Sequence, residues 1–145
     1  MILFCDTSAL VKLYIDEMGS ANVKQALAKA SSAVVSRITW VEIHSAFARR
    51  AREKTDNAAT LELAKVSIKT DWPSFAVTEI TQPLTELAAN YADAFALRAC
   101  DSVQLASATE VKRIAQTSVL FACYDLRLNK AAALLGLEIL IPEPT

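Results

Sequence analysis

Four acidic side chains stand among apolar or small residues, in settings where they could act together on a metal ion. They are Asp6 in FCDTSAL, Glu42 in ITWVEIHSAF, Asp101 in RACDSVQLASA and Asp125 in ACYDLRL. Two carboxylates about 4 Å apart repel by roughly 4 kcal/mol at an effective dielectric constant of about 20, so one takes up a proton unless a cation compensates. Oxygen ligands favour a hard ion such as Mg²⁺ or Mn²⁺, and a chain with one histidine, His44, offers little to zinc.

Three of these acids also have a simpler interpretation as helix caps. Asp6, Asp101 and Asp125 each stand where a helix is predicted to begin, and aspartate is a preferred residue at that position. Taken singly, each is better explained by capping than by catalysis. Glu42 differs because it lies inside a predicted helix, on a small and polar face that ends in Arg49, and it needs a partner or solvent there.

Short apolar runs alternate with longer helical patterns along the chain. Strand-like runs lie near residues 2, 33, 75, 119 and 137. Helices are predicted over 8–16, 20–30, 38–54, 57–71, 83–97, 102–115 and 126–135. This alternation indicates one α/β domain, 1–145, with a parallel sheet covered by helices. Sites in such folds lie beyond the carboxyl ends of the strands, where Asp6 and Asp125 are expected to project.

Several helix starts carry recognisable signals. Asp56 precedes NAATLELAKV, and Thr81 precedes QPLTELAANYADAF. Asp101 stands three residues before Gln104, an arrangement that resembles a capping box. These signals predict where three of the helices begin.

The composition excludes several classes of protein. Hydrophobic residues make up 53% of the 145, and only two glycines occur, so a glycine-rich nucleotide loop is ruled out. The three cysteines, Cys5, Cys100 and Cys123, lack C-x-x-C spacing and predict reduced, mostly buried thiols. No apolar run approaches the ~20 residues of a membrane span and no signal-like segment opens the sequence, so we expect a cytoplasmic protein.

Four stretches resemble, in order and separation, the acidic motifs of PIN-domain ribonucleases, and most closely those of VapC-type toxins of bacterial toxin–antitoxin pairs. They are DTSALVKLYIDE, ITWVEIHSAFARR, CDSVQLASA and YDLRL, and the resemblance runs from Ile2 to about Leu140. It implies a single PIN-like domain, an α/β/α sandwich with a four- or five-stranded, mainly parallel sheet. Cys100 stands where the family often has leucine, and Cys123 where it often has threonine. Neither difference removes a carboxylate.

The resemblance implies a metal-dependent ribonuclease that acts as the toxin of a type II pair. Asp6, Glu42, Asp101 and Asp125 would hold Mg²⁺ or Mn²⁺, with Ser8 as an accessory hydroxyl. Asp6 and Asp101 would be the central ligands, while Glu42 and Asp125 would bind through water or a second ion. Hydrolysis of RNA would leave a 3′-hydroxyl and a 5′-phosphate.

Basic residues near the acids are candidate contacts for RNA phosphates, although an ordinary charged surface explains them about equally well. They are Lys12, Arg49, Arg50 and Arg98. His44 is expected to have a structural or interface role rather than a catalytic one. The aromatic residues Trp40, Trp72 and Phe75 are expected in the core or an interface, and no aromatic patch indicates base stacking.

A partner surface is predicted in the segment SALVKLYIDEMGSANVKQAL, which could form a helical hairpin. Its candidate contacts are Leu10, Leu13, Tyr14 and Val23, which the core would leave partly exposed. Such a groove suits an amphipathic helix of another chain, and the resemblance implies a cognate VapB-like antitoxin there, together with a homodimer. Simple packing of these residues on the sheet explains them equally well.

Two other functions stay open on the residues alone. Asp6 at the end of a strand also suits the nucleophile of a phosphatase-like enzyme, although that chemistry usually has a second aspartate where this chain has Ser8. A non-catalytic, PIN-like binding module would keep the acids as a vestigial pocket. Cleavage of RNA that a chelator removes would distinguish the nuclease from both.

Overall fold

The computed structural model describes residues 1–140 and forms a three-layered α/β arrangement there. The strands are β1 (Ile2–Cys5), β2 (Ser32–Ser36), β3 (Ala76–Thr78), β4 (Val119–Ala122) and β5 (Glu138–Ile139). The helices are α1 (Thr7–Tyr14), α2 (Ser20–Lys29), α3 (Thr39–Arg52), α4 (Ala58–Asp71), the 3₁₀ turn η1 (Trp72–Ser74), α5 (Gln82–Phe95), α6 (Ala99–Ala115) and α7 (Leu126–Leu134). The predicted last strand reached Ile141, which lies outside the described residues.

The five strands form one sheet in the order β3-β2-β1-β4-β5, and every neighbouring pair is parallel. The central strand is β1, where Ile2 pairs with Ser32 of β2 on one side and with Val119 of β4 on the other. Three of its four residues are fully buried, because helices cover both faces of the sheet. The prediction of a mainly parallel sheet is therefore confirmed.

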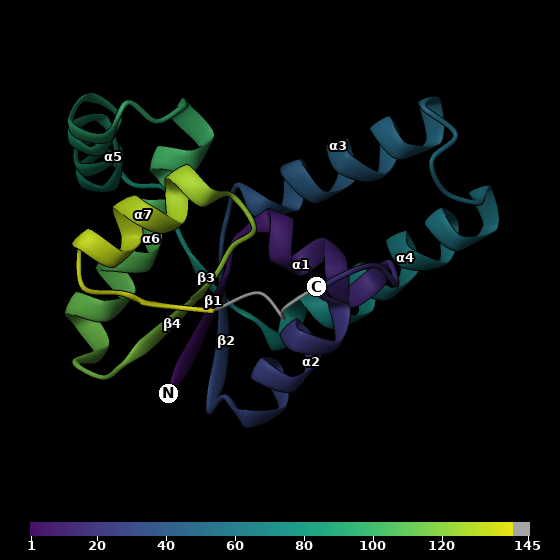
Figure 1. The fold of residues 1–145 in the computed structure, drawn as a ribbon, viewed down its shortest axis with the longest axis horizontal. Coiled ribbons are helices and arrows are strands. Elements are labelled where there is room, and N and C mark those ends of the chain that lie inside the picture. Colours follow the sequence, from purple (N-terminus) through teal and green to yellow (C-terminus); the bar gives the residue numbers. More distant parts are fainter. Residues whose placement is uncertain (141–145) are drawn as a thin grey trace.

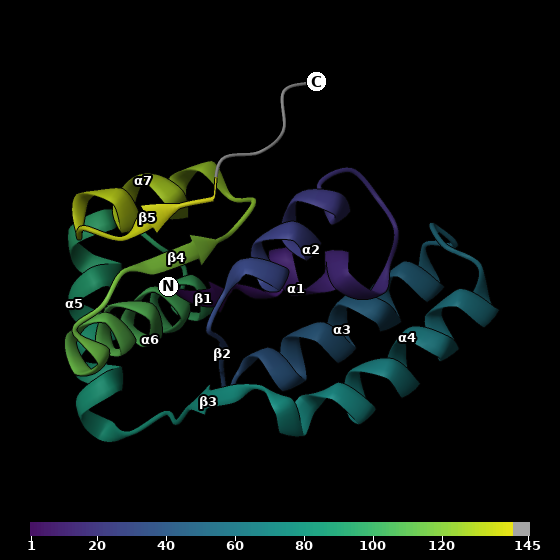
Figure 2. The same cartoon turned by 90° about the horizontal axis from the view of Figure 1, so that it is seen from below.

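Alternate side chains of the strands pack into two separate cores, one on each face of the sheet. Leu3 and Cys5 of β1 pack under α1, α2, α3 and α4, whereas Phe4 points to the opposite face. There Phe4 stacks on Phe121 of β4, with ring centroids 5.9 Å apart, beneath α6 and α7. Helix α5 packs against α6 as an outer element of the same side. Figure 2 shows the two helical groups on either side of the sheet, which is the α/β/α sandwich that was predicted.

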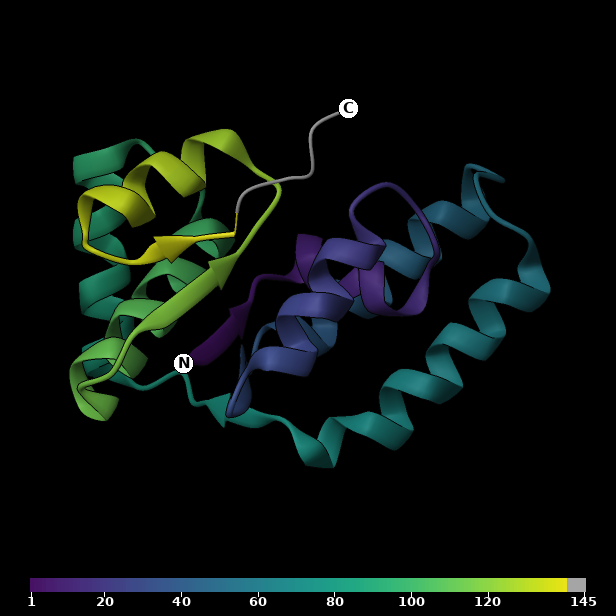
Figure 3. The same cartoon turned by 60° about the horizontal axis from the view of Figure 1, so that its bottom comes forward.

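Helices α3 and α4 form a hairpin that extends beyond the sheet (Figures 1 and 3). Ile43 and Phe47 of α3 are fully buried and fix this helix to the core. On its flank, His44 lies 4.6 Å from the ring of Trp40, and Trp40 meets Trp72 edge-on at 5.0 Å. Nδ1 of His44 is within 2.8 Å of the backbone oxygen of Trp40, a contact that supports the predicted structural role of His44.

Two of the predicted helix starts have different outcomes. Thr81 caps α5 as expected, with its hydroxyl oxygen accepting a hydrogen bond from the backbone N–H of Leu84. The cap of α4 is Asn57 rather than Asp56, so that prediction was wrong by one residue. The carboxylate of Asp56 instead forms an ion pair with the guanidinium of Arg50 at 3.2 Å.

Among the described residues, no helix is long and apolar enough to cross a membrane. The described cysteines do not form disulfides, and Cys5 and Cys123 are buried while Cys100 is exposed. The prediction of mostly buried thiols is confirmed for two of the three.

Candidate active site

The four predicted acids line one open cleft of about 720 Å³ at the carboxyl ends of the strands. Asp6 directly follows β1, and Asp125 stands at the start of α7, after β4. Glu42 lies in the first turn of α3, the helix that follows β2, and Asp101 lies in the first turn of α6. Parallel strands bring their carboxyl ends to one edge, so four segments that are distant in sequence meet there.

Asp6 is the most deeply buried of the four, with 6% of its surface exposed. It caps α1 through Oδ2, which accepts hydrogen bonds from the backbone N–H of Ser8 at 3.1 Å and from its hydroxyl at 2.6 Å. Burial raises the pKa of Asp6 to about 6; the bonds from Ser8 oppose that rise, and the charges of Glu42 and Asp101 add to it. Burial and the neighbouring acids thus make the charged form of this carboxylate unfavourable.

This burial predicts an unusual pH dependence of stability for the metal-free protein. The pKa of Asp6 rises from an ordinary 3.8 to about 6 on folding, so the folded protein retains a proton that the unfolded chain has released. The free energy of unfolding therefore decreases as pH rises through this window, by on the order of 3 kcal/mol from this group. Urea denaturation in chelator from pH 4 to 7.5 should show the advantage of Asp6→Asn over wild type growing across it. Parallel curves would contradict the assignment.

Asp101 does not cap its helix, so the capping-box interpretation was wrong. Helix α6 begins earlier, at Ala99, with Arg98 in the cap position, and Asp101 is in the first turn. Burial raises the pKa of Asp101; the charge of Asp125 adds to the rise, Arg98 opposes it, and Glu42 adds a smaller increase. The negative charges of two other acids in the cleft therefore raise the pKa of Asp101.

Ser8 and Asp125 join the first and fourth strands at the edge of the cleft. The hydroxyl oxygen of Ser8 accepts a hydrogen bond from the backbone N–H of Tyr124 at 3.0 Å while its proton goes to Asp6. Asp125 caps α7 as expected, with Oδ1 accepting from the backbone N–H of Leu128 at 2.9 Å. Ser8 thus acts as a bridge between the two aspartate-bearing segments.

Glu42 is held by polar residues that no local sequence pattern connects with it. Its Oε1 accepts hydrogen bonds from the hydroxyl of Thr7 at 2.9 Å and from Nε2 of Gln104 at 2.7 Å. Nε2 of Gln104 also lies 2.9 Å from the hydroxyl oxygen of Thr39. The one available signal was the spacing of Asp101 and Gln104, which suits a shared helix face as well as a capping box.

The donor set fits a hard divalent cation in charge and chemistry. Asp6, Glu42 and Asp125 each use one oxygen for the hydrogen bonds above, and no bond within residues 1–140 involves Oδ1 of Asp6, Oε2 of Glu42 or Oδ2 of Asp125. No three acidic, histidine or cysteine side chains of the described chain converge as a finished metal centre. Side-chain rotations of the kind that commonly accompany binding would be needed to close these oxygens on an ion.

Three of the four predicted RNA contacts, Lys12, Arg49 and Arg50, also line this cleft. Two of them are already paired. Nζ of Lys12 lies 3.1 Å from Glu17 and 4.5 Å from the ring centre of Tyr124, and Arg50 lies 2.8 Å from the same glutamate. Burial would raise the pKa of Glu17, but hydrogen bonds from Arg50 and Lys12 lower it overall. Arg49 is exposed on the wall, and Arg98 stands beside Asp101 at the start of α6.

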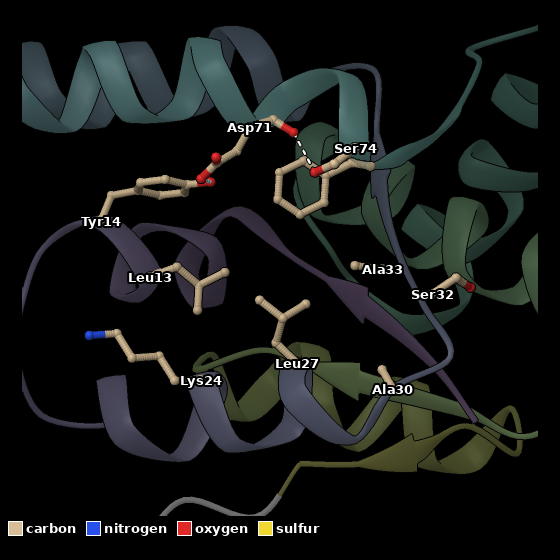
Figure 4. Close-up of a pocket in the computed structure, with 10 residues that line it drawn as sticks. Leu13, Tyr14, Lys24, Leu27, Ala30, Ser32, Ala33, Asp71 and Ser74 are labelled. Carbon is tan, nitrogen blue, oxygen red and sulfur yellow. Dashed lines mark hydrogen bonds between the residues drawn. The ribbon is translucent and has the colours of Figure 1, made fainter.

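The predicted partner surface is only partly present. Leu10 and Val23 are fully buried in the core, so their assignment as exposed contacts was wrong; they face the sheet rather than the hairpin's outer side. Leu13 and Tyr14 do line an open pocket of about 470 Å³ bordered by α1, α2, the end of α4 and η1 (Figure 4). Its polar edge is a hydrogen bond of 2.9 Å from the hydroxyl of Tyr14 to Asp71.

Comparison with known sequences gives a consistent result over nearly the whole chain. The sequence profile of the PIN domain matches residues 3–134. Two proteins of Mycobacterium tuberculosis, Ribonuclease VapC45 and Ribonuclease VapC49, are each 30% identical over 138 residues, which is 95% of this chain and 94% of theirs.

Solved structures share the same fold at lower identity. FitAcB of Neisseria gonorrhoeae is 18% identical, with 98% of each chain covered and a TM-score of 0.67. PAE2754 of Pyrobaculum aerophilum is 21% identical, covering 97% of this chain and 90% of its own, with a TM-score of 0.66. A toxin–antitoxin complex of Klebsiella pneumoniae is 20% identical over 83% of this chain and 84% of its own, with a TM-score of 0.56.

Proposed function

This chain belongs to the PIN-domain family, and from that membership and the cleft geometry we propose that it is a ribonuclease dependent on Mg²⁺ or Mn²⁺. It would hydrolyse internal RNA phosphodiester bonds and act as the toxin of a type II toxin–antitoxin pair. The observation that carries the proposal is the meeting of Asp6, Glu42, Asp101 and Asp125 in one cleft. The names of the two M. tuberculosis relatives support the choice of RNA as substrate.

Each acid has a distinct part in this proposal. Asp6 and Asp101 are the central ligands in this proposal. Burial and neighbouring acids raise the pKa of both, and a bound cation would stabilise their charged forms. Glu42 and Asp125 would act through water or a second ion and help to orient the attacking water. When bound, a divalent cation activates water and stabilises charge on the leaving oxygen.

Other cleft residues would contact the RNA or hold the acids in position. Ser8 holds Asp6 in place by its two hydrogen bonds. Arg49, exposed on the wall, is placed to contact RNA phosphates, and Lys12 and Arg50 would do so after exchanging part of their contact with Glu17. Arg98 would contribute from the start of α6.

The proposal predicts that a chelator stops RNA cleavage and that Mg²⁺ or Mn²⁺ restores it. Purified protein would be incubated with single-stranded RNA in EDTA, then with excess cation, and the new ends sequenced. We expect cleavage to fall to background in EDTA, because nothing then balances the carboxylates, and the products to carry 5′-phosphates. Persistent cleavage in EDTA would contradict the proposal, and a phosphorylated Asp6 trapped during turnover would instead support the phosphatase alternative.

The protein partner we propose is a VapB-like antitoxin, with the toxin as a homodimer in the cytoplasm. The VapC names of the relatives and the toxin–antitoxin complex among the similar folds support this choice. The pocket lined by Leu13 and Tyr14 is the surface we propose for a helix of that partner.

A further inference from the structure

Gln104 is a fully buried amide whose side chain reaches from α6 to Glu42 of α3, a residue that lines the cleft. Its Nε2 lies 2.7 Å from Oε1 of Glu42, a residue 62 positions away in sequence. The same nitrogen lies 2.9 Å from the hydroxyl oxygen of Thr39 and 3.2 Å from that of Thr7. One amide group of α6 therefore joins the starts of α1 and α3 around one acid.

The available protons determine how this network is connected. Nε2 carries two hydrogens, so the shortest contacts assign them to Glu42 and Thr39. Thr7, 2.9 Å from the same Oε1, donates its own hydroxyl proton to Glu42. Turning the amide over would set two acceptor oxygens against each other at the Glu42 contact. Glu42 thus fixes the orientation of Gln104, and Gln104 in return fixes Oε1 of Glu42.

The amide is not explained by stability alone. Its other atom, Oε1 of Gln104, is buried without a hydrogen-bond partner among the described residues. A buried acceptor without a partner is unfavourable, and an apolar side chain of similar shape would avoid that penalty. The amide is therefore best explained by what its N–H groups do for Glu42.

We propose that Gln104 is a positioning residue, which with Thr7 holds one carboxylate oxygen of Glu42 and leaves Oε2 to face the cation and its water. This inference rests on the proposed function, because it assigns a purpose to Gln104 within that site. Gln104 itself touches neither RNA nor the reacting atoms. Residues that orient the ligands of a metal in this way typically change metal affinity or activity by about 10- to 100-fold when they are replaced.

The test replaces Gln104 by methionine, which keeps the length of the side chain and removes its donors. Mn²⁺ affinity would be measured by electron paramagnetic resonance, and RNA cleavage by kcat and KM. We expect Mn²⁺ to bind about tenfold more weakly and kcat to fall about 10- to 100-fold, while KM for RNA stays within about twofold. Thermal unfolding without metal should give a Tm close to that of wild type, because the unpartnered Oε1 of Gln104 is removed while Glu42 and Thr39 each lose one donor.

The matched control is Ser107→Ala, which removes another fully buried polar group of α6. Within residues 1–140, its hydroxyl bonds only to the backbone oxygen of Val103 in its own helix. It should leave Mn²⁺ affinity and kcat unchanged. If Gln104→Met does not fold, Gln104→Leu provides the same measurement. A folded variant with wild-type Mn²⁺ affinity and kcat would overturn the inference while the proposed function stands. A wild type that neither binds Mn²⁺ nor cleaves RNA would overturn both.

Discussion

We expect Asp6→Asn to eliminate RNA cleavage and at the same time to make the metal-free protein more stable. Activity falls because a central ligand loses its charge, and a cation's contribution of several kcal/mol to the transition state corresponds to a loss of about 10³-fold or more. Stability rises because burial and the nearby charges of Glu42 and Asp101 raise the pKa of Asp6 to about 6, so its charged form is unfavourable at neutral pH. Asparagine also caps helices well, so α1 keeps its start.

The two effects are measured together at pH 7.5. Cleavage is followed with excess Mg²⁺, and urea denaturation is followed in EDTA, where the gain should be about 1–3 kcal/mol. Asp93→Asn, which neutralises an exposed aspartate of α5 away from the cleft, is the control and should change neither quantity appreciably. An inactive Asp6→Asn that is also less stable would indicate a damaged fold and not a lost ligand.

Phe47→Ala has the opposite profile, with a large loss of stability and an intact site. Phe47 is fully buried and fixes α3, the helix that carries Glu42, against the core. Replacing a buried phenylalanine by alanine costs about 3–5 kcal/mol, a large share of the roughly 5–15 kcal/mol that holds a domain of this size together. None of the hydrogen bonds to Glu42 involves Phe47.

Denaturation and cleavage measured at 10 °C would separate these contributions. We expect the midpoint in urea to fall sharply, while the rate of cleavage per folded molecule stays within about threefold of wild type. Val66→Ala is the matched control, because Val66 on α4 is apolar but 61% exposed, and surface replacements of this kind change stability by about 0.5 kcal/mol or less. Unchanged stability of Phe47→Ala would contradict the described core.

These variants distinguish two parts of the chain. The buried acids of the cleft lower the free energy of unfolding, whereas the packed core raises it. In the cleft, Asp6 is buried beside other acids and Gln104 carries a buried acceptor without a partner among the described residues. Both features are unfavourable for folding alone. Such features gathered in one cleft are typical of a functional site.

Local patterns were sufficient for much of the fold. Alternating strand and helix patterns predicted the parallel sheet, because the central strands β1 and β4 are continuous apolar runs that helices cover on both faces. The acids could be placed at one edge because Asp6 and Asp125 follow strands directly. Helix caps were predictable at Asp6, Thr81 and Asp125, where one side chain bonds to its own next turn.

Contacts between distant segments could not be predicted in this way. The bond from Gln104 to Glu42 spans 62 residues, and its local spacing to Asp101 is the same as that of a capping box. Similarly, Leu10 looked like a surface residue of a hairpin, because the sequence does not specify which face of α1 meets the sheet. The pairing of Lys12 with Glu17 depends on a loop whose course no periodic pattern describes.

The central claim is that the four acids together bind one kind of ligand, a divalent cation. Substoichiometric Mn²⁺ added to ¹⁵N-labelled protein broadens the amide signals of residues near the ion. The account predicts selective broadening at Asp6, Ser8, Glu42, Asp101 and Asp125, with its loss in Asp6→Asn, while signals around the distant acids Glu62 and Glu79 stay sharp. Broadening at those distant acids, or none in the cleft, would contradict it.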